Sequence, residues 1–474
     1  MKRSHFLLHL LFILLAFSSF SVLINLISKP KTRPYPSLKN PNSRFLHPPL
    51  KVYVADLPRS FNYGLLSDLY SLSGHDNRLG TNPDADRFSS FFYRLFKTYL
   101  SVPPYPENPL IKPHAAEYWL LKHLEMNKNP AGGATAVRVR NLDEADVVFV
   151  PFFASLSAEM ELGWGTKGKF RKKIAEKNGD YRRQREVVDR IKASAAWRRS
   201  GGRDHVFVMS DPVAMWHVRS EIAPAILLVE DFGGWYQADM KATVSGDACN
   251  STYIIQHTEA SLLKDVIVPY NHLIPRFHIS QNQPRHTLLY FKGAKHRHRG
   301  GSIREKLWQL LENVPGVKME EGSLNATGLE EAKRGMRDAE FCLHPAGDTP
   351  TSCRLFDAIA SLCIPVIVSD QIELPFEGVL DYTEFAVFVS VKNALTPNWL
   401  MEHLRGFSEK KKEIFRVNLA GVQSYFEYEG GDAVSQIWEM VYQKLPMIRQ
   451  GLVADRRKLD DIDRELKPVT CLCT

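Results

Sequence analysis

A basic, glycine-containing loop carries the first residues whose types and spacing suit a chemical task. Residues 290–307, YFKGAKHRHRGGSIREKL, run from a predicted strand into a predicted helix. The stretch holds four basic side chains of interest, Lys292, Arg297, Arg299 and Arg304. Such side chains donate charge-assisted hydrogen bonds to phosphate oxygens, so they suit a diphosphate. Support of the protein core is the alternative role, and we favour phosphate binding.

A second polar stretch reads GDTPTSCR and leads into an apolar, helix-forming run. Thr349 is a good N-cap and Pro350 suits the first helical position, so a helix is predicted to start there. The free N–H groups and the dipole at a helix start attract anions. We therefore expect Thr351, Ser352 and Arg354 to complete the diphosphate pocket.

Two carboxylates follow the basic residues. Asp357 shares a predicted helix face with Arg354, away from the apolar face that packs into the core. In that position Asp357 would be free to accept hydrogen bonds from ribose hydroxyls, and changing it would spare the core. Glu373, at the end of the next predicted strand, could accept hydrogen bonds in the same way.

Three motifs that suggest a cofactor do not fit their context. Asp84 and Asp86 match the D-x-D pattern of metal-bound nucleotide sugars, but no apolar strand leads into them, which predicts a solvated loop. Gly163–Gly168 match G-x-G-x-x-G well beyond the nearest predicted strand. HRHR at 296–299 has adjacent arginines that would repel a cation. The sequence therefore predicts no metal site.

Residues 166–203 form the most basic segment of the chain. They hold fourteen Lys and Arg against four Asp and Glu, whereas the whole chain has a net charge of +8. Apolar residues at helical spacing mark a core side, so we interpret the charges as a solvated helix face. Attraction to an anionic polymer or a membrane surface is the alternative.

The elements that must position these residues form two α/β sets. Short apolar runs alternate with helical patterns, which predicts mainly parallel sheets with crossover helices. The apolar runs begin at 51, 145, 204, 225 and 265 and, after a turn-rich stretch, at 287, 339, 364 and 385. We predict domains at 51–285 and 286–445, with ligands bound between them at the carboxyl ends of the strands.

The ends of the chain have their own compositions. Residues 6–27 form an uncharged run of 22 residues, which is long enough to cross a bilayer. This run predicts a retained signal anchor with residues 1–5 in the cytoplasm, and a cleaved signal peptide is the alternative. Residues 28–50 are rich in proline and predict an extended stem. Residues 446–474 alternate charges and predict a mobile tail.

A secretory start places the domains in an oxidising lumen. Asn250 and Asn325 lie in Asn-x-Ser/Thr triplets and are predicted glycosylation sites. Six cysteines could form one to three disulfides, and the sequence does not determine their connectivity. The same start, together with the lack of a recognition module, argues against nucleic acid, and we expect no nucleic-acid partner.

Residues 339–376, AEFCLHPAGDTPTSCRLFDAIASLCIPVIVSDQIELPF, resemble the nucleotide-sugar-binding region of the exostosin-like glycosyltransferases, in particular their plant cell-wall branch. KVYVADLPRSFN, ADVVFVPFF, GGRDHVFV, KDVIVPY and LLYFKGAKHRHRGGSIREKL match the same family in order, and the resemblance spans residues 50–445. It implies a GT-B fold, with two Rossmann-like domains facing a cleft, in a type II Golgi membrane protein. It further implies an inverting mechanism and a UDP-sugar donor. Within the family the chain is most similar to the arabinosyltransferase-like members associated with pectic arabinan.

The resemblance also implies roles for single residues. Ser352 and Arg354 would contact the diphosphate and Asp357 the ribose, with no metal required. An inverting transfer also needs a base that deprotonates the acceptor hydroxyl, and this base should come from the first domain. The sequence offers three unranked candidates, Asp56, Asp211 and His217.

A second class of function stays open at this point. The chain could be a non-catalytic partner that anchors or stabilises another Golgi glycosyltransferase, with the fold retained and turnover lost. The basic pocket favours an enzyme, because a scaffold has no need of one. The expected partners are a UDP-sugar, a cell-wall polysaccharide, the Golgi membrane and other glycosyltransferases.

Overall fold

The computed structural model describes ten stretches of the chain, residues 47–73, 102–126, 134–162, 178–231, 261–281, 284–296, 303–323, 325–347, 349–370 and 372–459. No helix in these stretches combines the length and the apolar character needed to cross a bilayer. The predicted anchor at 6–27, the D-x-D pair at 84–86 and the motif at 163–168 lie outside the described residues. Most of the predicted stem and the glycosylation triplet at Asn250 lie outside them too.

The first domain is built on a six-stranded parallel sheet with the order β2-β1-β3-β4-β5-β6. Its strands are β1 (Leu50–Val54), β2 (Ala136–Val139), β3 (Val147–Phe149), β4 (His205–Met209), β5 (Ile226–Val229) and β6 (Val266–Ile267). Its helices are α2 (Tyr63–Ser73), α4 (Ala116–Met126), α5 (Ala154–Leu162), α6 (Gly179–Ala193) and α7 (Ala195–Ser200). Strands β3, β4 and β5 are buried along their whole length, as expected for a parallel sheet covered on both faces.

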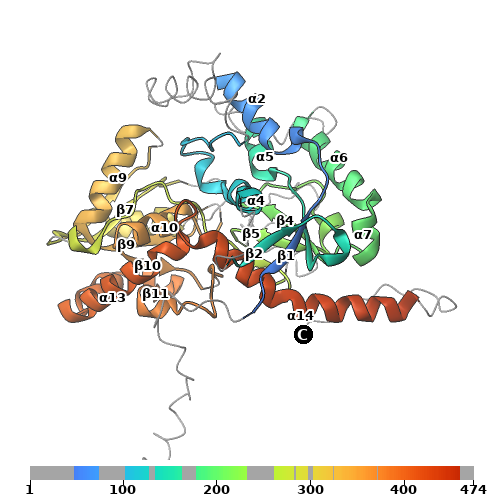
Figure 1. Cartoon of the computed structure of the whole chain (residues 1–474). Helices are drawn as coiled ribbons and strands as arrows, with labels where there is room; N and C mark the ends of the chain where they lie inside the picture. Colours follow the sequence, from blue (N-terminus) through green and yellow to red (C-terminus); the bar gives the residue numbers. More distant parts are fainter. Residues whose placement is uncertain are drawn as a thin grey trace, which may run out of the picture. The chain divides into compact units, whose positions relative to one another are not determined.

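The second domain is built on a five-stranded parallel sheet with the order β11-β10-β9-β7-β8 (Figure 1). Its strands are β7 (Thr287–Lys292), β8 (Val317–Glu320), β9 (Ala339–Pro345), β10 (Ile364–Val368) and β11 (Val387–Val389). Its helices are α8 (Ile303–Leu311), α9 (Ala326–Asp338), α10 (Cys353–Ala360), α11 (Val391–Ala394), α12 (Trp399–Arg405) and α13 (Glu409–Val422). The prediction of two parallel α/β sets is therefore confirmed.

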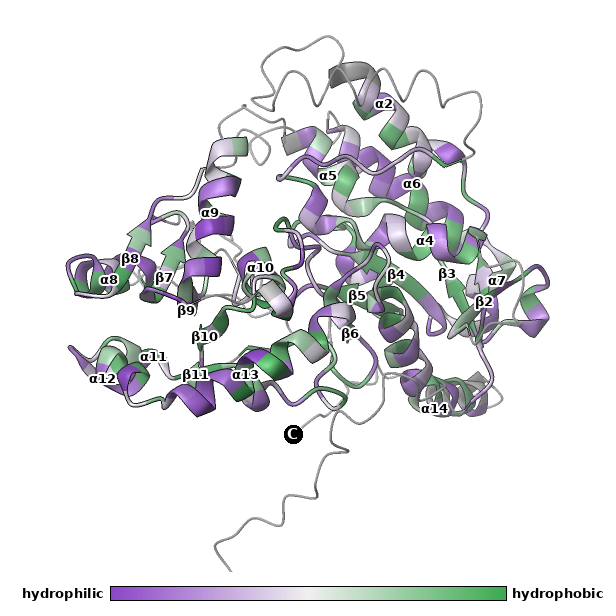
Figure 2. Ribbon diagram, turned by 60° about the vertical axis from the view of Figure 1, so that its left-hand side comes forward, coloured by the Kyte–Doolittle hydropathy of each residue, from purple (hydrophilic) through white to green (hydrophobic). Residues whose placement is uncertain are grey.

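The two strands that the sequence analysis missed, β2 and β8, lie at sheet edges. Each carries an exposed basic residue in its middle, Arg138 in β2 and Lys318 in β8. An edge strand keeps one side open to solvent, so its sequence lacks the continuous apolar run that marks a central strand. In Figure 2 the central strands β3 and β4 are green, as expected for apolar runs.

The last helix, α14 (Ala433–Leu459), returns to the first sheet although it follows the second in the chain. It packs against α4, β1, β2 and β6 (Figure 1). Its Trp438 is completely buried, with the ring centroid 5.8 Å from that of Phe149 in β3. The helix also continues past residue 445, where we placed the start of a mobile tail. The described residues of both sheets fall within a single compact unit of the chain.

A disulfide joins Cys342 in β9 to Cys363, which precedes β10. Both cysteines are buried, and their Cα atoms are 5.7 Å apart. Cys353, at the start of α10, is not disulfide-bonded. The crosslink fastens the two strands whose carboxyl ends flank the start of α10.

Five of the eight basic side chains that the structure describes in the basic segment pair with acidic side chains. Arg185 and Lys192 of α6 both bind Glu221, and Arg199 of α7 lies 2.6 Å from Asp204. These pairs support our interpretation of a solvated helix face, because they leave less positive charge to attract an anionic polymer.

Candidate active site at the ends of the strands

Helix α10 begins at Cys353, so the prediction of Thr349 as its N-cap is wrong and Ser352 occupies that position. Thr349 instead donates its hydroxyl to the carbonyl oxygen of Thr351 at 2.8 Å. The N–H of Thr351 donates to Oδ2 of Asp231, in the first domain, at 2.8 Å. These bonds hold the segment before α10 outside the helix and against the first domain.

The start of α10 presents polar atoms that no other described residue satisfies. The hydroxyl oxygens of Thr351 and Ser352 are buried and have no hydrogen-bond partner in the part of the chain that the structure describes. The Ser352 side chain also does not cap the helix, which leaves N–H groups of the first turn to other partners. Buried polar groups are normally paired, so this start suits a ligand rich in oxygen. The arrangement fits the predicted contact with a diphosphate.

Arg354 reaches from the first turn of α10 to the end of β7. Its Nε donates to the carbonyl oxygen of Lys292. A Cβ at Gly293 would lie 3.0 Å from Arg354 Nε and 2.9 Å from Cζ of Phe291, so only glycine allows this close approach. The terminal η nitrogens of Arg354 form no hydrogen bond with another described residue, and they can bind an anion in a bidentate manner.

Lys292, predicted to bind phosphate, is engaged inside the second domain. Its Nζ lies 2.8 Å from Glu331 and 3.4 Å from Glu320, and its side chain is buried. These contacts favour the supporting role that we had set aside. Arg297 and Arg299, from the same loop, lie outside the described residues.

Arg304 is also a supporting residue in this structure. It is 2% exposed and donates hydrogen bonds to the carbonyl oxygens of Ala346, at 3.0 Å, and Pro345, at 3.4 Å. A Cβ at Gly347 would lie 2.6 Å from one of its η nitrogens. Arg304 therefore shapes the loop that leads to α10, which corrects our expectation that it faces the phosphate.

His344 is a site residue that the sequence analysis missed. It lies at the carboxyl end of β9, and its buried Nε2 has no hydrogen-bond partner among the described residues. Burial and the positive charges of Arg304 and Arg354 lower the pKa of His344 to about 3, so its imidazole is neutral. A neutral imidazole nitrogen can donate to or accept from a ligand without adding charge. The only signal in the sequence was a histidine at the end of a predicted strand.

We had expected Asp357 to be free on a polar helix face, but its side chain is buried. Its Oδ1 accepts hydrogen bonds from the backbone N–H groups of Leu273, at 2.7 Å, and Ile274, at 3.0 Å. Burial raises the pKa of Asp357. This effect outweighs the lowering of the pKa by the two hydrogen bonds and by His272. Asp357 thus ties α10 to the segment that joins the two sheets. The prediction that its substitution would spare the core is wrong, and its contact with a ribose stays a prediction.

Asp357→Ala is expected to reduce the free energy of unfolding by about 2–4 kcal/mol, because two buried N–H groups lose their acceptor. Thermal melting of the purified full-length chain measures this loss. Asp189→Ala, at an exposed position of α6, is the matched control and should change stability by less than about 0.5 kcal/mol. An unchanged melting temperature for Asp357→Ala would show that the carboxylate does not hold the two segments together.

Glu373 follows β10 and is partly exposed. Burial raises its pKa, and it forms no hydrogen bond or ion pair with another described residue. Its predicted role at the donor site therefore stays a prediction.

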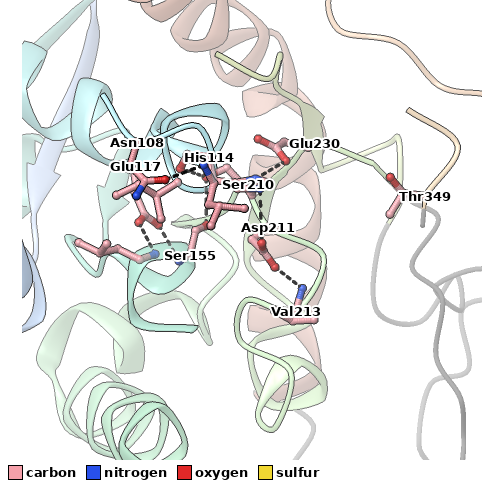
Figure 3. Close-up of polar contacts among 12 residues, drawn as sticks. Asn108, His114, Glu117, Ser155, Ser210, Asp211, Val213, Glu230 and Thr349 are labelled. Carbon is pink, nitrogen blue, oxygen red and sulfur yellow. Dashed lines mark hydrogen bonds and ion pairs between the residues drawn. The ribbon is translucent and has the colours of Figure 1, made fainter. Parts of the chain in front are cut away.

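A cluster of charged residues occupies the carboxyl ends of β4 and β5 (Figure 3). His114, from the short helix η2 (Lys112–His114), lies with its Nδ1 2.9 Å from Oε2 of Glu230. The same nitrogen contacts the carbonyl oxygen of Ser210. Its Nε2 lies 3.6 Å from Oδ2 of Asp211, the candidate base from the SDP stretch. One imidazole is thus held between two carboxylates.

The charged groups of this cluster shift one another's pKa values. Burial lowers the pKa of His114, but Glu230 and Asp211 outweigh it and raise the pKa to about 10, so His114 is a cation. Burial raises the pKa of Glu230 to about 8, although His114 lowers it. A carboxylate that takes up a proton near neutral pH is suited to general-base chemistry.

The cluster lies against the start of α10. Asp231, the neighbour of Glu230, accepts the hydrogen bond from Thr351. Tyr270, which follows β6, is buried beside Glu230 and packs against Phe356 of α10, with ring centroids 6.0 Å apart. The polar start of α10 and the carboxylates at the ends of β4 and β5 therefore meet, and we call this region the junction.

Another buried carboxylate, that of Glu117, supports the cluster through hydrogen bonds. Glu117 of α4 accepts hydrogen bonds from the N–H groups of Ser155 and Leu156, both at 3.0 Å, at the start of α5 (Figure 3). The hydroxyl of Ser155 lies 3.1 Å from that of Ser210, which donates to the carbonyl oxygen of His114. This chain of bonds fixes the position of His114.

The structure separates the three candidate bases. Asp211 lies in the junction cluster, with its Oδ1 accepting from the N–H of Val213 at 2.7 Å. Asp56 lies instead in an exposed position after β1. His217 packs edge-on against Tyr181 of α6, with ring centroids 5.0 Å apart, and burial lowers its pKa. Of the three, Asp211 is the one that contacts His114.

Known protein families and relatives match most of the chain. The Exostosin GT47 domain matches residues 46–404. A probable arabinosyltransferase, ARAD1 of Arabidopsis thaliana, is 33% identical over 432 residues, which cover 90% of this chain and 86% of that protein. A probable beta-1,4-xylosyltransferase, IRX10 of the same plant, is 26% identical, with coverage of 66% of this chain and 73% of that protein.

Similarity to solved structures is weaker. CalG4, the calicheamicin glycosyltransferase, aligns over 84% of this chain and 99% of its own, with 12% sequence identity and a TM-score of 0.28. The GtfA/B complex aligns over 58% of this chain and 61% of its own, with a TM-score of 0.30. Overall similarity this low supports no conclusion about the site, so the site is argued from the chain's own geometry.

Proposed function

This chain belongs to the exostosin GT47 family of glycosyltransferases, and from this premise we propose that it moves a sugar from a UDP-sugar to a plant cell-wall polysaccharide with inversion at the anomeric carbon. The relative of highest identity named above suggests arabinose as the transferred sugar. We further propose that the two parallel sheets form a GT-B arrangement, with the donor bound by the second domain and the acceptor by the first.

The donor side of the proposed reaction uses the start of α10. The unpaired hydroxyls of Thr351 and Ser352, the η nitrogens of Arg354 and the N–H groups of the first turn would bind the diphosphate. These groups stabilise the negative charge that collects on the departing UDP. The neutral imidazole of His344 would make a further contact with the donor beside these groups.

The acceptor side uses the carboxylates of the first domain. We assign Glu230 as the general base, because its pKa is near neutral and His114 holds it at the end of β5. It takes the proton of an acceptor hydroxyl as that oxygen forms a bond to the anomeric carbon. The bond from the anomeric carbon to the UDP oxygen breaks, and its electron pair leaves with UDP. Asp211, on the other side of the imidazole, orients His114 and stabilises its protonated form.

The observation that carries this proposal is the junction itself. The hydrogen bond between Asp231 and Thr351 brings an anion-binding helix start next to a proton-accepting carboxylate. Transfer by direct displacement needs both functions within reach of one substrate pair.

The direct test is a transfer assay of the purified full-length chain with a panel of UDP-sugars and wall oligosaccharides. We expect transfer from one UDP-sugar, with the rate nearly unchanged by chelator, because Arg354 and the helix start can neutralise the leaving group. Complete loss of the rate with chelator, restored by a divalent metal, would overturn the assignment of that role to Arg354.

We also propose a Golgi location with the catalytic domains in the lumen, on the basis of the apolar run at residues 6–27 and the glycosylation triplets. Protease treatment of sealed microsomes tests this topology. Digestion of the region beyond residue 50 without detergent would contradict it.

A non-catalytic partner of another Golgi glycosyltransferase remains the alternative function. The junction argues against it, since a scaffold needs neither unpaired buried hydroxyls nor a carboxylate with a raised pKa. Failure of the full panel, combined with binding of the chain to an active glycosyltransferase, would favour this alternative.

A further inference from the structure

A polar cavity lies in the first domain at the carboxyl ends of β1 and β2, and the reaction proposed above does not use it. Its volume is about 910 Å³, and it is open to solvent. Seven charged or aromatic residues line it, Tyr53, Asp56, Arg59, Tyr63, Glu125, Arg138 and Arg140. Ligands of parallel sheets bind at this edge, so the cavity is in a position to bind one.

The cavity has an excess of positive charge. Arg138 and Arg140 are exposed, and neither forms an ion pair or hydrogen bond through its side chain with another described residue. Arg59, the third arginine, lies 5.1 Å from the ring centre of Tyr63. Two guanidinium groups that line one cavity and have open donors suit a carboxylate, which accepts two parallel hydrogen bonds.

The three arginines of the cavity outnumber its two acidic residues, Asp56 and Glu125. Glu125 is engaged by the hydroxyl of Tyr63, which donates to its Oε2 at 2.9 Å. Asp56 is exposed and can accept hydrogen bonds from sugar hydroxyls. Tyr53 is partly exposed and offers an aromatic surface beside them. A charged carboxylate, hydroxyl groups and a ring face are together the features of an acidic sugar.

The cavity is separated from the junction by a distance that suits a polymer. In the sheet, β1 is three strands from β5, which carries Glu230. Adjacent strands are about 4.8 Å apart, so the cavity lies on the order of 14 Å across the sheet from the proposed base. A single sugar cannot reach both places, whereas an acceptor chain of several units can.

We propose that this cavity is an acceptor subsite that binds a carboxylate-bearing sugar unit of the wall polysaccharide, several units from the hydroxyl that receives the new sugar. Arg138 and Arg140 bind the carboxylate, and Asp56 accepts from the hydroxyls of the ring. This inference rests on the proposed function, because it takes the acceptor to be a wall polysaccharide. It makes the substrate class an acidic polymer.

Calorimetry with the purified full-length chain tests the subsite without any turnover. Trigalacturonic acid is compared with its methyl ester and with a neutral arabinose trisaccharide. We expect the acid to bind and the two uncharged ligands to bind at least tenfold more weakly. Arg138→Gln combined with Arg140→Gln should weaken binding of the acid by about tenfold or more, since hydrogen bonds to charged groups are worth more than neutral ones.

The control removes the same charge elsewhere. Arg182→Gln combined with Arg190→Gln changes two exposed residues of α6 and should leave binding of the acid unchanged. Equal weakening by both double variants would show that the acid is attracted only by net charge and would overturn the subsite. Equal binding of acid and methyl ester would overturn it too.

Two further measurements distinguish this proposal from binding of a carboxylate on the donor and from a failure of the proposed function. UDP-glucuronic acid should not compete with trigalacturonic acid, and competition would place the carboxylate on the donor instead. The Arg138/Arg140 variant should keep its affinity for UDP and its transfer to a short neutral acceptor. Transfer with no binding of the acid would overturn the subsite alone, whereas binding of the acid with no transfer from any donor would support the subsite and count against the proposed function.

Discussion

Glu230→Gln is expected to lower kcat by about 10²- to 10⁴-fold, the range associated with loss of a general base. The amide keeps the size of the side chain but cannot take the proton of the acceptor hydroxyl. Binding of UDP should be unchanged, because Glu230 lies in the first domain and contacts His114 rather than the start of α10. Transfer rates and UDP titration of the full-length variant measure the two effects separately.

The pH dependence of the wild-type enzyme gives the same assignment an independent test. A base works only when it is deprotonated, so kcat/KM should rise with pH up to the pKa of Glu230, about 8, and level off above it. His114, with a pKa of about 10, keeps its charge throughout this rise. The rise below pH 8 should disappear in Glu230→Gln, leaving a low and flat profile.

Glu117→Gln is the matched control for this variant. Glu117 is also completely buried, and burial raises its pKa to about 8, but both of its oxygens are occupied by backbone N–H groups of α5. The change should therefore lower the melting temperature and leave the pH profile of the remaining activity in its wild-type form. If Glu230→Gln kept the wild-type kcat, the base would have to be sought elsewhere, with Asp211 as the first candidate.

Arg354→Ala is expected to reduce transition-state stabilisation by about 2–4 kcal/mol, the cost of removing one preorganised donor to a developing negative charge. This corresponds to a loss of roughly 30- to 1000-fold in kcat/KM, mostly in kcat, because the charge on UDP grows as the bond breaks. The melting temperature without ligand should fall only slightly, since one hydrogen bond to Lys292 is lost. The increase in melting temperature on adding UDP should become smaller.

Two variants sharpen the interpretation of this result. Arg354→Lys keeps the charge but not the fork of donors, so it should recover only part of the rate. Arg276→Ala removes an exposed arginine that pairs with Glu427 at 3.2 Å, and this variant should keep wild-type kinetics. Wild-type kinetics and a wild-type response to UDP in Arg354→Ala would show that the arginine only supports the backbone at the end of β7.

Local sequence patterns were sufficient to predict two parallel α/β sheets, although not every strand in them. The run Ile364–Val368 predicted a fully buried strand, and all five of its residues are buried in β10. A parallel central strand is apolar on both faces, so its own residues identify it. The edge strands β2 and β8 were missed because exposed charged residues interrupt them. The family also followed from local motifs, since these are contiguous in the chain.

The roles of the polar residues depended on partners that are distant in the chain. Asp357 looked free three positions from Arg354, but in the fold Leu273 and Ile274 bring it two N–H groups. Thr349 looked like an N-cap, but the bond from Thr351 to Asp231 moves the helix start to Cys353. In both cases a tertiary hydrogen bond outweighed a local preference that is worth about 1 kcal/mol.

Asp211, one of the three candidate bases, shows most clearly what the sequence could and could not determine. The sequence placed Asp211 after a predicted strand and could not rank it, because its surroundings come from three separate segments. His114 and Glu230 are distant in the chain, and the convergence of η2, β4 and β5 at one sheet edge brings them together. Sequence determined which strands carry carboxylates at their ends. Only the tertiary structure determined which of them share an imidazole, because burial and charge coupling act through space and not along the chain.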